Sequence, residues 1–344
     1  MLFEIKDVDK KTYKDQIRDF IPEKIIDIHT HVFLEEHKDH NILNRMPSSW
    51  WERVAKDQSI EDLLESYELM FPGKQVTPLV FFASVNPDLT EGNELVRKVA
   101  EKHNFPALIF SKPTWTASKL EEGILAGKFI GAKAYHNYVP EYIPINEVRI
   151  FDFFPHHHLE VLDRHGWIMM LHVPRPGRLG DPVNLAQILE IEKKYPNIKL
   201  VIAHGGCTYY HEAIGDAFDV LADTKKVMFE ISANTYAPAF EKIIQCVGPK
   251  RIMFGSDLPV LRMRMRRISK NGSYVNIVPR GLYGDVSADP KMREVKGEEA
   301  EALTFFMYEE IKAFRQAAEA TGLSRGAIED IFYNNARQML NIEQ

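Results

Sequence analysis

The sequence is poor in cysteine and in long apolar runs, and its 43 basic residues are outnumbered by 49 acidic ones. Only Cys207 and Cys246 occur among its 344 residues, so a disulfide framework is excluded and a reducing cytoplasm is expected. No apolar run approaches the roughly 18–20 residues needed to cross a bilayer, and the charged N-terminus lacks the apolar core of a signal peptide. The formal charge of −6 argues against a nucleic-acid partner. We therefore expect a globular protein without a membrane or nucleic-acid partner.

The composition is that of an ordinary globular protein, with 45% hydrophobic and 27% charged residues. Short apolar runs alternate with longer amphipathic stretches. Several of the runs, such as PLVFFAS and IKLVIAH, are apolar almost throughout, which is typical of parallel strands covered on both faces. We predict eight such strands, at residues 25–31, 78–84, 107–111, 129–135, 167–172, 198–204, 227–231 and 251–257.

Helical signals fall between these strands. Ser59 and Asp62 have the spacing of a capping box, and Asp181 before Pro182 is typical of a helix start. Repeated strand–helix alternation implies right-handed crossovers and a parallel sheet, and eight units predict a (β/α)8 TIM barrel. A doubly wound open sheet is the alternative that periodicity alone leaves open.

The chain is predicted to be one domain, residues 1–344. The barrel core covers about 25–260, with an insertion at 32–58 after the first strand and another at 261–297 after the eighth. Residues 298–344 are predicted to form closing helices. Long loops in compact domains are often lids or binding loops, so these insertions are expected to select the substrate.

The strongest chemical signal is His29 and His31 at the end of the first strand. Residues two apart in a strand project to the same face, so both imidazoles should point into the barrel mouth. Lys133, His172, His204 and Asp257 end later apolar strands, at the rim where barrel enzymes place their sites. His29, His31, His172 and Asp257 would offer three nitrogens and one oxygen, a set that suits Zn²⁺ and also Mn²⁺ or Fe²⁺.

Five segments carry a resemblance to a known family: IIDIHTHVF, GAKAYH, MMLHV, VIAHGG and FGSDLPV. In this order they resemble the amidohydrolase superfamily, in the amidohydrolase-related (amidohydrolase 2) branch that also holds decarboxylases similar to aminocarboxymuconate-semialdehyde decarboxylase. The resemblance implies a (β/α)8 barrel and one divalent ion, zinc by preference, held by His29, His31, His172 and Asp257. It also implies that His204 lies beside the metal-bound water or the substrate as an acid/base group.

Three basic residues near the mouth point to an anionic small-molecule substrate. Lys133 has three interpretations: a carboxylated lysine that bridges two metals, a contact to the substrate, which we favour, or a lysine paired with a carboxylate. Arg175 and Arg178 follow the fifth strand in HVPRPGR, and arginine suits bidentate carboxylate recognition.

The expected function is hydrolysis of a C–N or C–O bond, in an amide, lactone or ester of a small carboxylate-bearing substrate, by metal-activated water. Asp257 would take the proton from the water, and His204 would stabilise the oxyanion or protonate the leaving group. The alternative is non-oxidative decarboxylation of an aromatic or unsaturated acid, because the same ligand set supports both reactions. A third interpretation is a barrel that only binds. Homo-oligomerisation is expected from base rates alone.

Overall fold

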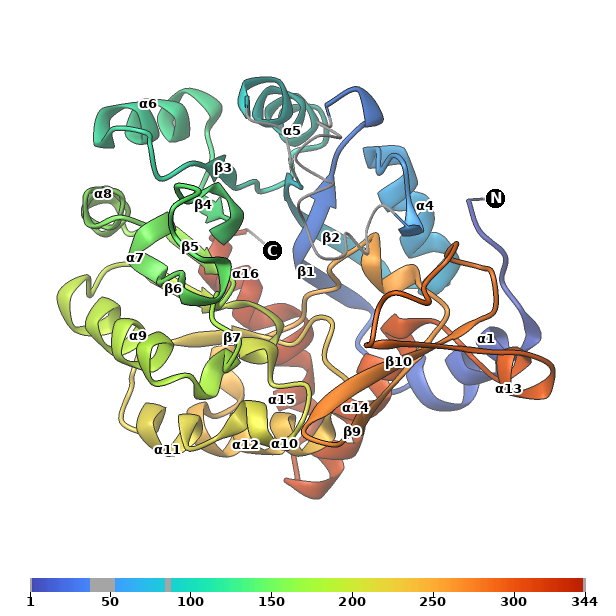
Figure 1. The fold of residues 1–344 in the computed structure, drawn as a ribbon. Coiled ribbons are helices and arrows are strands. Elements are labelled where there is room, and N and C mark those ends of the chain that lie inside the picture. Colours follow the sequence, from blue (N-terminus) through green and yellow to red (C-terminus); the bar gives the residue numbers. More distant parts are fainter. Residues whose placement is uncertain (1, 38–52, 84–87, 343–344) are drawn as a thin grey trace.

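A computed structural model describes residues 2–37, 53–83 and 88–342. The chain forms a closed parallel barrel that is surrounded by helices (Figure 1). The strands of the barrel are β1 (Lys24–Val32), β2 (Gln75–Phe82), β3 (Ile109–Ser111), β4 (Gly131–Ala134), β5 (Ile168–Leu171), β6 (Lys199–Ile202), β7 (Met228–Glu230) and β8 (Ile252–Met253). Each predicted strand overlaps one of them.

Two contacts close the barrel. β1 pairs with β2, and β3 to β8 form a six-stranded parallel sheet. A parallel bridge between Val80 and Ala107 joins β2 to the start of β3, and one between Thr30 and Leu258 joins β1 to the segment after β8. The predicted (β/α)8 barrel is therefore confirmed, and the open sheet is excluded.

Helices cover the outside of the barrel (Figure 1). The longer ones are α4 (Ile60–Met70), α5 (Thr90–His103), α6 (Ala117–Gly127), α8 (His156–His165), α9 (Pro182–Lys194), α12 (Ala237–Val247) and α14 (Phe306–Ala320). The shorter ones are α1 (Asp7–Thr12), α7 (Ile150–Phe153), α10 (His211–Ile214), α11 (Ala217–Leu221), α13 (Glu298–Glu301), α15 (Arg325–Glu329) and α16 (Asn335–Leu340). Both predicted helix starts are confirmed: Ser59 accepts a hydrogen bond from the Asp62 N–H at 3.0 Å, and Asp181 accepts one from the Val183 N–H at 2.9 Å. No helix in the described part of the chain has the length and apolarity needed to span a bilayer.

The C-terminal helices cover one end of the barrel. Met339 of α16 packs in one cluster with Ile26 and Ile168, near the starts of β1 and β5. Its carbonyl accepts a hydrogen bond from Lys199, the first residue of β6, at 2.8 Å. Because this end is closed, the side chains at the carboxyl ends of the strands face the opposite mouth.

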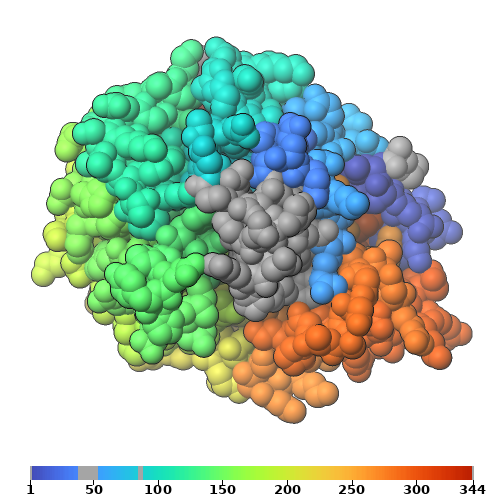
Figure 2. Space-filling model, turned by 45° about the horizontal axis from the view of Figure 1, so that its top comes forward, coloured from blue at the N-terminus to red at the C-terminus, as the bar shows by residue number. Residues whose placement is uncertain are grey.

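The segment after β8 forms a small sheet of its own. It contains β9 (Arg266–Lys270), β10 (Ser273–Pro279) and β11 (Met292–Val295), with β10 in the middle. Arg53 donates hydrogen bonds to the carbonyls of Tyr283 and Asp285 at 2.8 and 3.0 Å. The two predicted insertions are therefore in contact. Figure 2 shows the surface of the segment after β8, in orange, beside blue atoms of the early chain. Most of the first insertion, residues 38–52, lies outside the described residues.

Several predicted strands ran past the carboxyl ends of the observed strands, among them two that were predicted to end at candidate site residues. β6 stops at Ile202 and β8 at Met253, whereas the predictions ran to His204 and Asp257. The reason is backbone conformation, since His204 has φ 57° and Asp257 has φ 51°, values in the left-handed region that no strand adopts.

Candidate metal centre

His29 and His31 of β1 converge on Asp257, which follows β8. The Asp257 Oδ1 atom lies 3.1 Å from His31 Nε2 and 3.5 Å from His29 Nε2. His29 is fully buried, and His31 and Asp257 are nearly so. The three side chains come from opposite ends of the barrel sequence and meet because β1 and the segment after β8 are neighbours in the closed sheet.

The residues present fit a divalent ion. Two ligands on a tetrahedral zinc, at bond lengths near 2.0–2.1 Å, lie about 3.3 Å apart, and the two distances to Asp257 bracket that value. His29 Nε2 is buried and makes no hydrogen bond to the described residues. Leaving such a nitrogen unsatisfied is costly, and an ion would satisfy it.

The electrostatics of the cluster also favour a cation. Burial alone would raise the pKa of Asp257, but the hydrogen bond from His31 holds it below its usual range. Burial keeps the pKa values of His29 and His204 well below that of a free histidine. Neutral imidazoles beside an ionised carboxylate are the state that binds a divalent metal.

His172 lies farther from this cluster than the sequence analysis expected. Its ring centre is 5.1 Å from that of His204, Nδ1 is 3.1 Å from the Val173 carbonyl oxygen, and Nε2 is 3.8 Å from the sulfur of Cys207. The compact group of ligand atoms contains His29, His31 and Asp257 without His172. Coordination by His172 therefore stays a prediction, and it requires the imidazole to turn away from Cys207.

His204 stands between His29 and His172. Its ring centre is 4.7 Å from that of His29, and its Nδ1 is 2.8 Å from the Ser232 hydroxyl. This position beside the candidate metal ligands is compatible with the predicted acid/base role of His204.

Backbone strain gathers around this mouth. Five residues other than glycine that have positive φ values follow barrel strands here: Arg178, His204, Cys207, Ala233 and Asp257. Such a conformation costs on the order of 1–3 kcal/mol per residue and is typical of functional sites.

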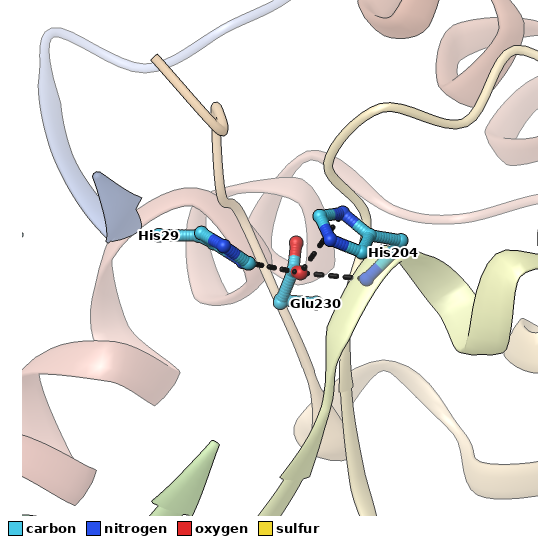
Figure 3. Close-up of side chains that lie close together, drawn as sticks. All are labelled: His29, His204 and Glu230. Carbon is cyan, nitrogen blue, oxygen red and sulfur yellow. Dashed lines mark hydrogen bonds and ion pairs between the residues drawn. The ribbon is translucent and has the colours of Figure 1, made fainter. Parts of the chain in front are cut away.

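The sequence analysis missed Glu230, the last residue of β7. It is fully buried, and its Oε1 lies 2.8 Å from His29 Nδ1 and 2.6 Å from the His204 N–H (Figure 3). The signal was present, because Glu230 lies one residue before the end of the predicted apolar strand 227–231, near the same rim as His172 and His204.

Asp27, two residues before His29, was also missed. It is fully buried and accepts hydrogen bonds from the Tyr67 hydroxyl at 2.8 Å and the Ser256 N–H at 2.9 Å. Burial raises its pKa to about 7, although these hydrogen bonds oppose the shift. Asp27 thus ties β1 to α4 and to the segment that carries Asp257.

Lys133 on β4 is buried with no partner for its Nζ atom among the described residues. The nitrogen lies 5.2 Å from the Tyr135 ring centre and 5.6 Å from that of Phe81. Burial lowers its pKa to about 8, and the charges of Glu230 and Asp257 partly oppose the shift. The structure gives no support to the interpretation that Lys133 is paired with a carboxylate.

The two arginines after β5 differ in their contacts. Arg175 donates to both oxygens of Asp181, at 3.1 and 3.2 Å, and to the Glu147 carbonyl at 2.9 Å, so its guanidinium already holds the loop together. The backbone of Arg178 is hydrogen-bonded to Arg175, Asp181 and Asn184, but its half-buried guanidinium has no hydrogen-bond or ion-pair partner among the residues that the structure describes. Arg178 is therefore the better candidate for an anionic substrate.

Comparison with known proteins places the chain in a family. The family model described as "Amidohydrolase" matches residues 26–342. The chain belongs to the amidohydrolase family. This confirms the resemblance found in the sequence and makes the protein an enzyme of a metal-dependent superfamily. No curated protein matches the chain.

Solved structures share this amidohydrolase fold at low sequence identity. An amidohydrolase from Burkholderia multivorans with bound zinc is 13% identical, with a TM-score of 0.58 over 93% of this chain and 99% of that one. A dihydroxybenzoic acid decarboxylase from Polaromonas sp. JS666 with bound manganese is 14% identical, with a TM-score of 0.53 over 94% and 98%. A protein from Pseudomonas putida assigned as a 2-pyrone-4,6-dicarboxylic acid hydrolase is 15% identical, with a TM-score of 0.53 over 94% and 100%. The fold is thus shared by hydrolases and decarboxylases.

Proposed function

We propose that the protein is a metal-dependent hydrolase of a C–N or C–O bond in a small carboxylate-bearing substrate. The observation that carries this proposal is the convergence of His29 Nε2 and His31 Nε2 on Asp257 Oδ1 at 3.5 and 3.1 Å, with His29 Nε2 otherwise without a hydrogen-bond partner in the described chain. His29, His31 and Asp257 would hold the ion, with His172 as a further ligand after its ring turns. Zinc is the preferred metal, and manganese or iron also suits this donor set.

Each side chain at the mouth has a role in this reaction. A bound divalent ion lowers the pKa of its water from 15.7 to about 7 and polarises a carbonyl. Asp257 would take a proton from the attacking water, and this proton would pass by way of the free Nε2 of His204 to the leaving group. Arg178 binds the substrate carboxylate in bidentate geometry, and Lys133 offers a second positive charge.

Decarboxylation of an aromatic acid is the second candidate. The Nζ atom of Lys133 lies above the rings of Phe81 and Tyr135, so the base of the mouth combines a cation with flat apolar surfaces. Such surfaces stack against an aromatic ring. In this reaction the same acid/base histidine would supply the proton to carbon.

A metal assay combined with a substrate panel tests the proposal. Purified protein should carry about one divalent ion per chain, and His31→Ala and Asp257→Asn should lose it. His158→Gln, at a buried histidine outside the mouth, is the control and should keep it. If both His31→Ala and Asp257→Asn keep the ion, the proposed metal centre is wrong.

The panel should contain amides and lactones that bear carboxylates, together with hydroxybenzoic acids. Cleavage without gas release supports hydrolysis, whereas release of CO2 from the acids supports the second candidate. Failure of the metal-loaded protein to convert any of them would favour the barrel that only binds.

A further inference from the structure

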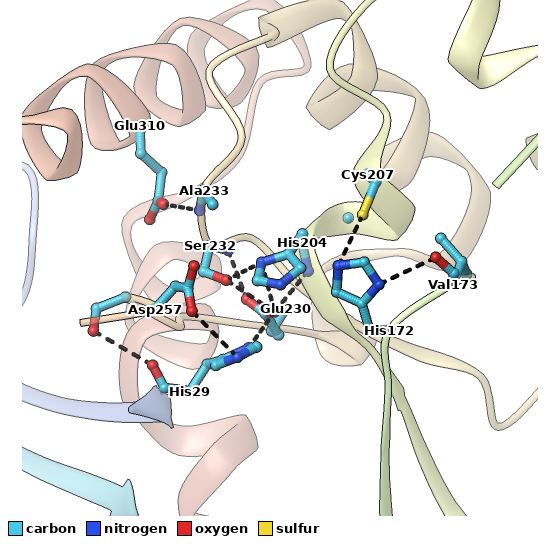
Figure 4. A network of polar contacts seen from close by, with 12 residues as sticks. His29, His172, Val173, His204, Cys207, Glu230, Ser232, Ala233, Asp257 and Glu310 are labelled. Atoms are coloured by element: carbon cyan, nitrogen blue, oxygen red, sulfur yellow. Dashed lines mark hydrogen bonds and ion pairs between the residues drawn. The ribbon is translucent and has the colours of Figure 1, made fainter. Parts of the chain in front are cut away.

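Glu230 is the hub of the polar network below the mouth (Figure 4). Its Oε1 lies 2.8 Å from His29 Nδ1, and it accepts hydrogen bonds from the His204 N–H at 2.6 Å and the Ser232 hydroxyl at 2.9 Å. Its Oε2 accepts the Ser232 N–H at 2.6 Å. One buried carboxylate therefore contacts β1, the turn after β6 and its own loop after β7.

The barrel leaves room for this carboxylate by means of a glycine. A Cβ atom at Gly255, two residues before Asp257, would lie 2.6 Å from Glu230 Oε2 and 2.9 Å from His29 Cβ. No real contact is that short, so a side chain at Gly255 would push the carboxylate away from His29. The close packing of the FGSD segment against Glu230 thus requires glycine at position 255.

The hydrogen bonds determine which nitrogen of each histidine carries a proton. A carboxylate only accepts hydrogen bonds, so His29 must be protonated at Nδ1, which leaves the Nε2 lone pair facing Asp257. The Ser232 hydroxyl gives its only proton to Glu230, so it accepts one from His204 Nδ1, 2.8 Å away. His204 is then also left with a free Nε2.

We infer that Glu230 is a positioning residue that sets the tautomers of two histidines, the metal ligand His29 directly and the acid/base residue His204 through Ser232. This inference rests on the proposed function, because it concerns the same site. His29, His204 and Glu230 also form a group that could hold an ion. We assign this group to positioning the histidines instead, because three hydrogen-bond donors already contact Glu230 Oε1. Partners of this kind typically change metal affinity by 10–100-fold.

Glu310 provides a matched control. It is also fully buried, and its Oε2 accepts the N–H of Ala233, at 2.7 Å, on the same loop. Among the described residues, Glu310 makes no hydrogen bond to His29 or His204. Burial and the nearby Glu230 raise the pKa of Glu310 well above its usual value, so the neutral amide of glutamine should replace it with little change.

The experiment compares Glu230→Gln, Glu310→Gln and Ser232→Ala. Zinc affinity is measured by chelator competition, circular dichroism checks the fold, and proton NMR of the imidazole region reports the slowly exchanging His29 Nδ1–H. We expect Glu230→Gln to bind zinc about 10–100-fold more weakly and to lose this signal. Glu310→Gln should match the wild type in both measurements, and Ser232→Ala should keep the zinc affinity while the His204 tautomer changes.

A folded Glu230→Gln protein with wild-type zinc affinity would overturn the inference. If Glu230→Gln does not fold, anomalous diffraction from zinc-soaked wild-type crystals decides. An ion on His29 Nε2, with Glu230 outside its ligand shell, supports the positioning role, whereas an ion bonded to Glu230 or to His29 Nδ1 overturns it. Absence of any ion from the mouth would instead refute the metal centre itself.

Discussion

Two arginines represent two kinds of charged residue in this protein, one paired and one unpaired. Arg264 forms a bidentate ion pair with the fully buried Asp9, at 2.9 and 2.7 Å, and it holds the segment after β8 against the N-terminal helix. The guanidinium of Arg178, by contrast, has no carboxylate or hydrogen-bond partner in the described part of the chain. The first kind serves the fold, and the second is available to a ligand.

Substituting these two arginines should have opposite consequences. Arg264→Gln leaves the Asp9 carboxylate buried and unpaired, which should lower the free energy of unfolding by about 3–5 kcal/mol. Arg178→Gln removes an unpaired charge and should leave thermal stability unchanged or slightly higher, while KM for a carboxylate substrate rises about 10–100-fold. Urea denaturation and steady-state kinetics measure the two effects, and equal loss of stability in both variants would contradict this distinction.

At the scale of elements, the turn after β6 is the most unusual part of the barrel. His204, Gly205, Gly206 and Cys207 all have positive φ values, between 55° and 70°. A run of left-handed residues is unfavourable for L-amino acids, so the two glycines lower its cost. The turn lets the backbone N–H of His204 reach Glu230 while its ring stays at the mouth.

Gly206→Ala should therefore be more harmful than Gly73→Ala. Both glycines have positive φ, but a Cβ at Gly206 would lie 2.7 Å from Leu179 Cβ, whereas a Cβ at Gly73 meets nothing within 4 Å. We expect Gly73→Ala to cost about 1–2 kcal/mol from the backbone alone and Gly206→Ala about 1–3 kcal/mol more from overpacking. Thermal unfolding of both variants measures the difference, and equal costs would show that Leu179 moves aside freely.

At the scale of the whole molecule, stability depends on histidines that the fold keeps neutral. His158 of α8 is fully buried, and burial lowers its pKa to about 4 despite a hydrogen bond to the Trp115 carbonyl. A histidine in the unfolded chain has a pKa of about 6.5. Between these values the unfolded chain binds more protons, so the free energy of unfolding must fall as the pH falls.

The wild type should thus lose up to about 3 kcal/mol from His158 between pH 6.5 and 4. His158→Gln should remove that part of the pH dependence, because glutamine does not titrate. His157→Gln, at the neighbouring exposed position, is the control and should keep the wild-type slope. Urea unfolding of the three proteins across this pH range measures how the free energy of unfolding depends on pH. An identical pH dependence in all three would show that His158 is not the titrating group.

Metal removal should also destabilise the whole barrel, because the proposed ligands come from β1 and from the segment after β8, the first and last parts of the barrel. Binding at 100 times Kd adds about 2.7 kcal/mol to the free energy of unfolding, which for a chain of this size corresponds to about 4 °C in Tm. Scanning calorimetry with zinc and with a chelator measures the shift. His29→Ala should show none, and a zinc-dependent rise in that variant would place the ion elsewhere.

The sequence by itself determined the parallel strands and their order, and it predicted the barrel and the candidate ligands, because several apolar runs carry a histidine or a carboxylate near their carboxyl ends; only the bridges that close the barrel excluded an open sheet. Tertiary structure alone decided how these residues are used. It separated Arg175, held by Asp181, from the unpaired Arg178, turned His172 toward Cys207, and revealed Glu230 and Asp27 beneath His29. Periodicity reports which face of an element is buried, whereas hydrogen-bond partners far apart in the chain depend on how the closed barrel brings its strands together.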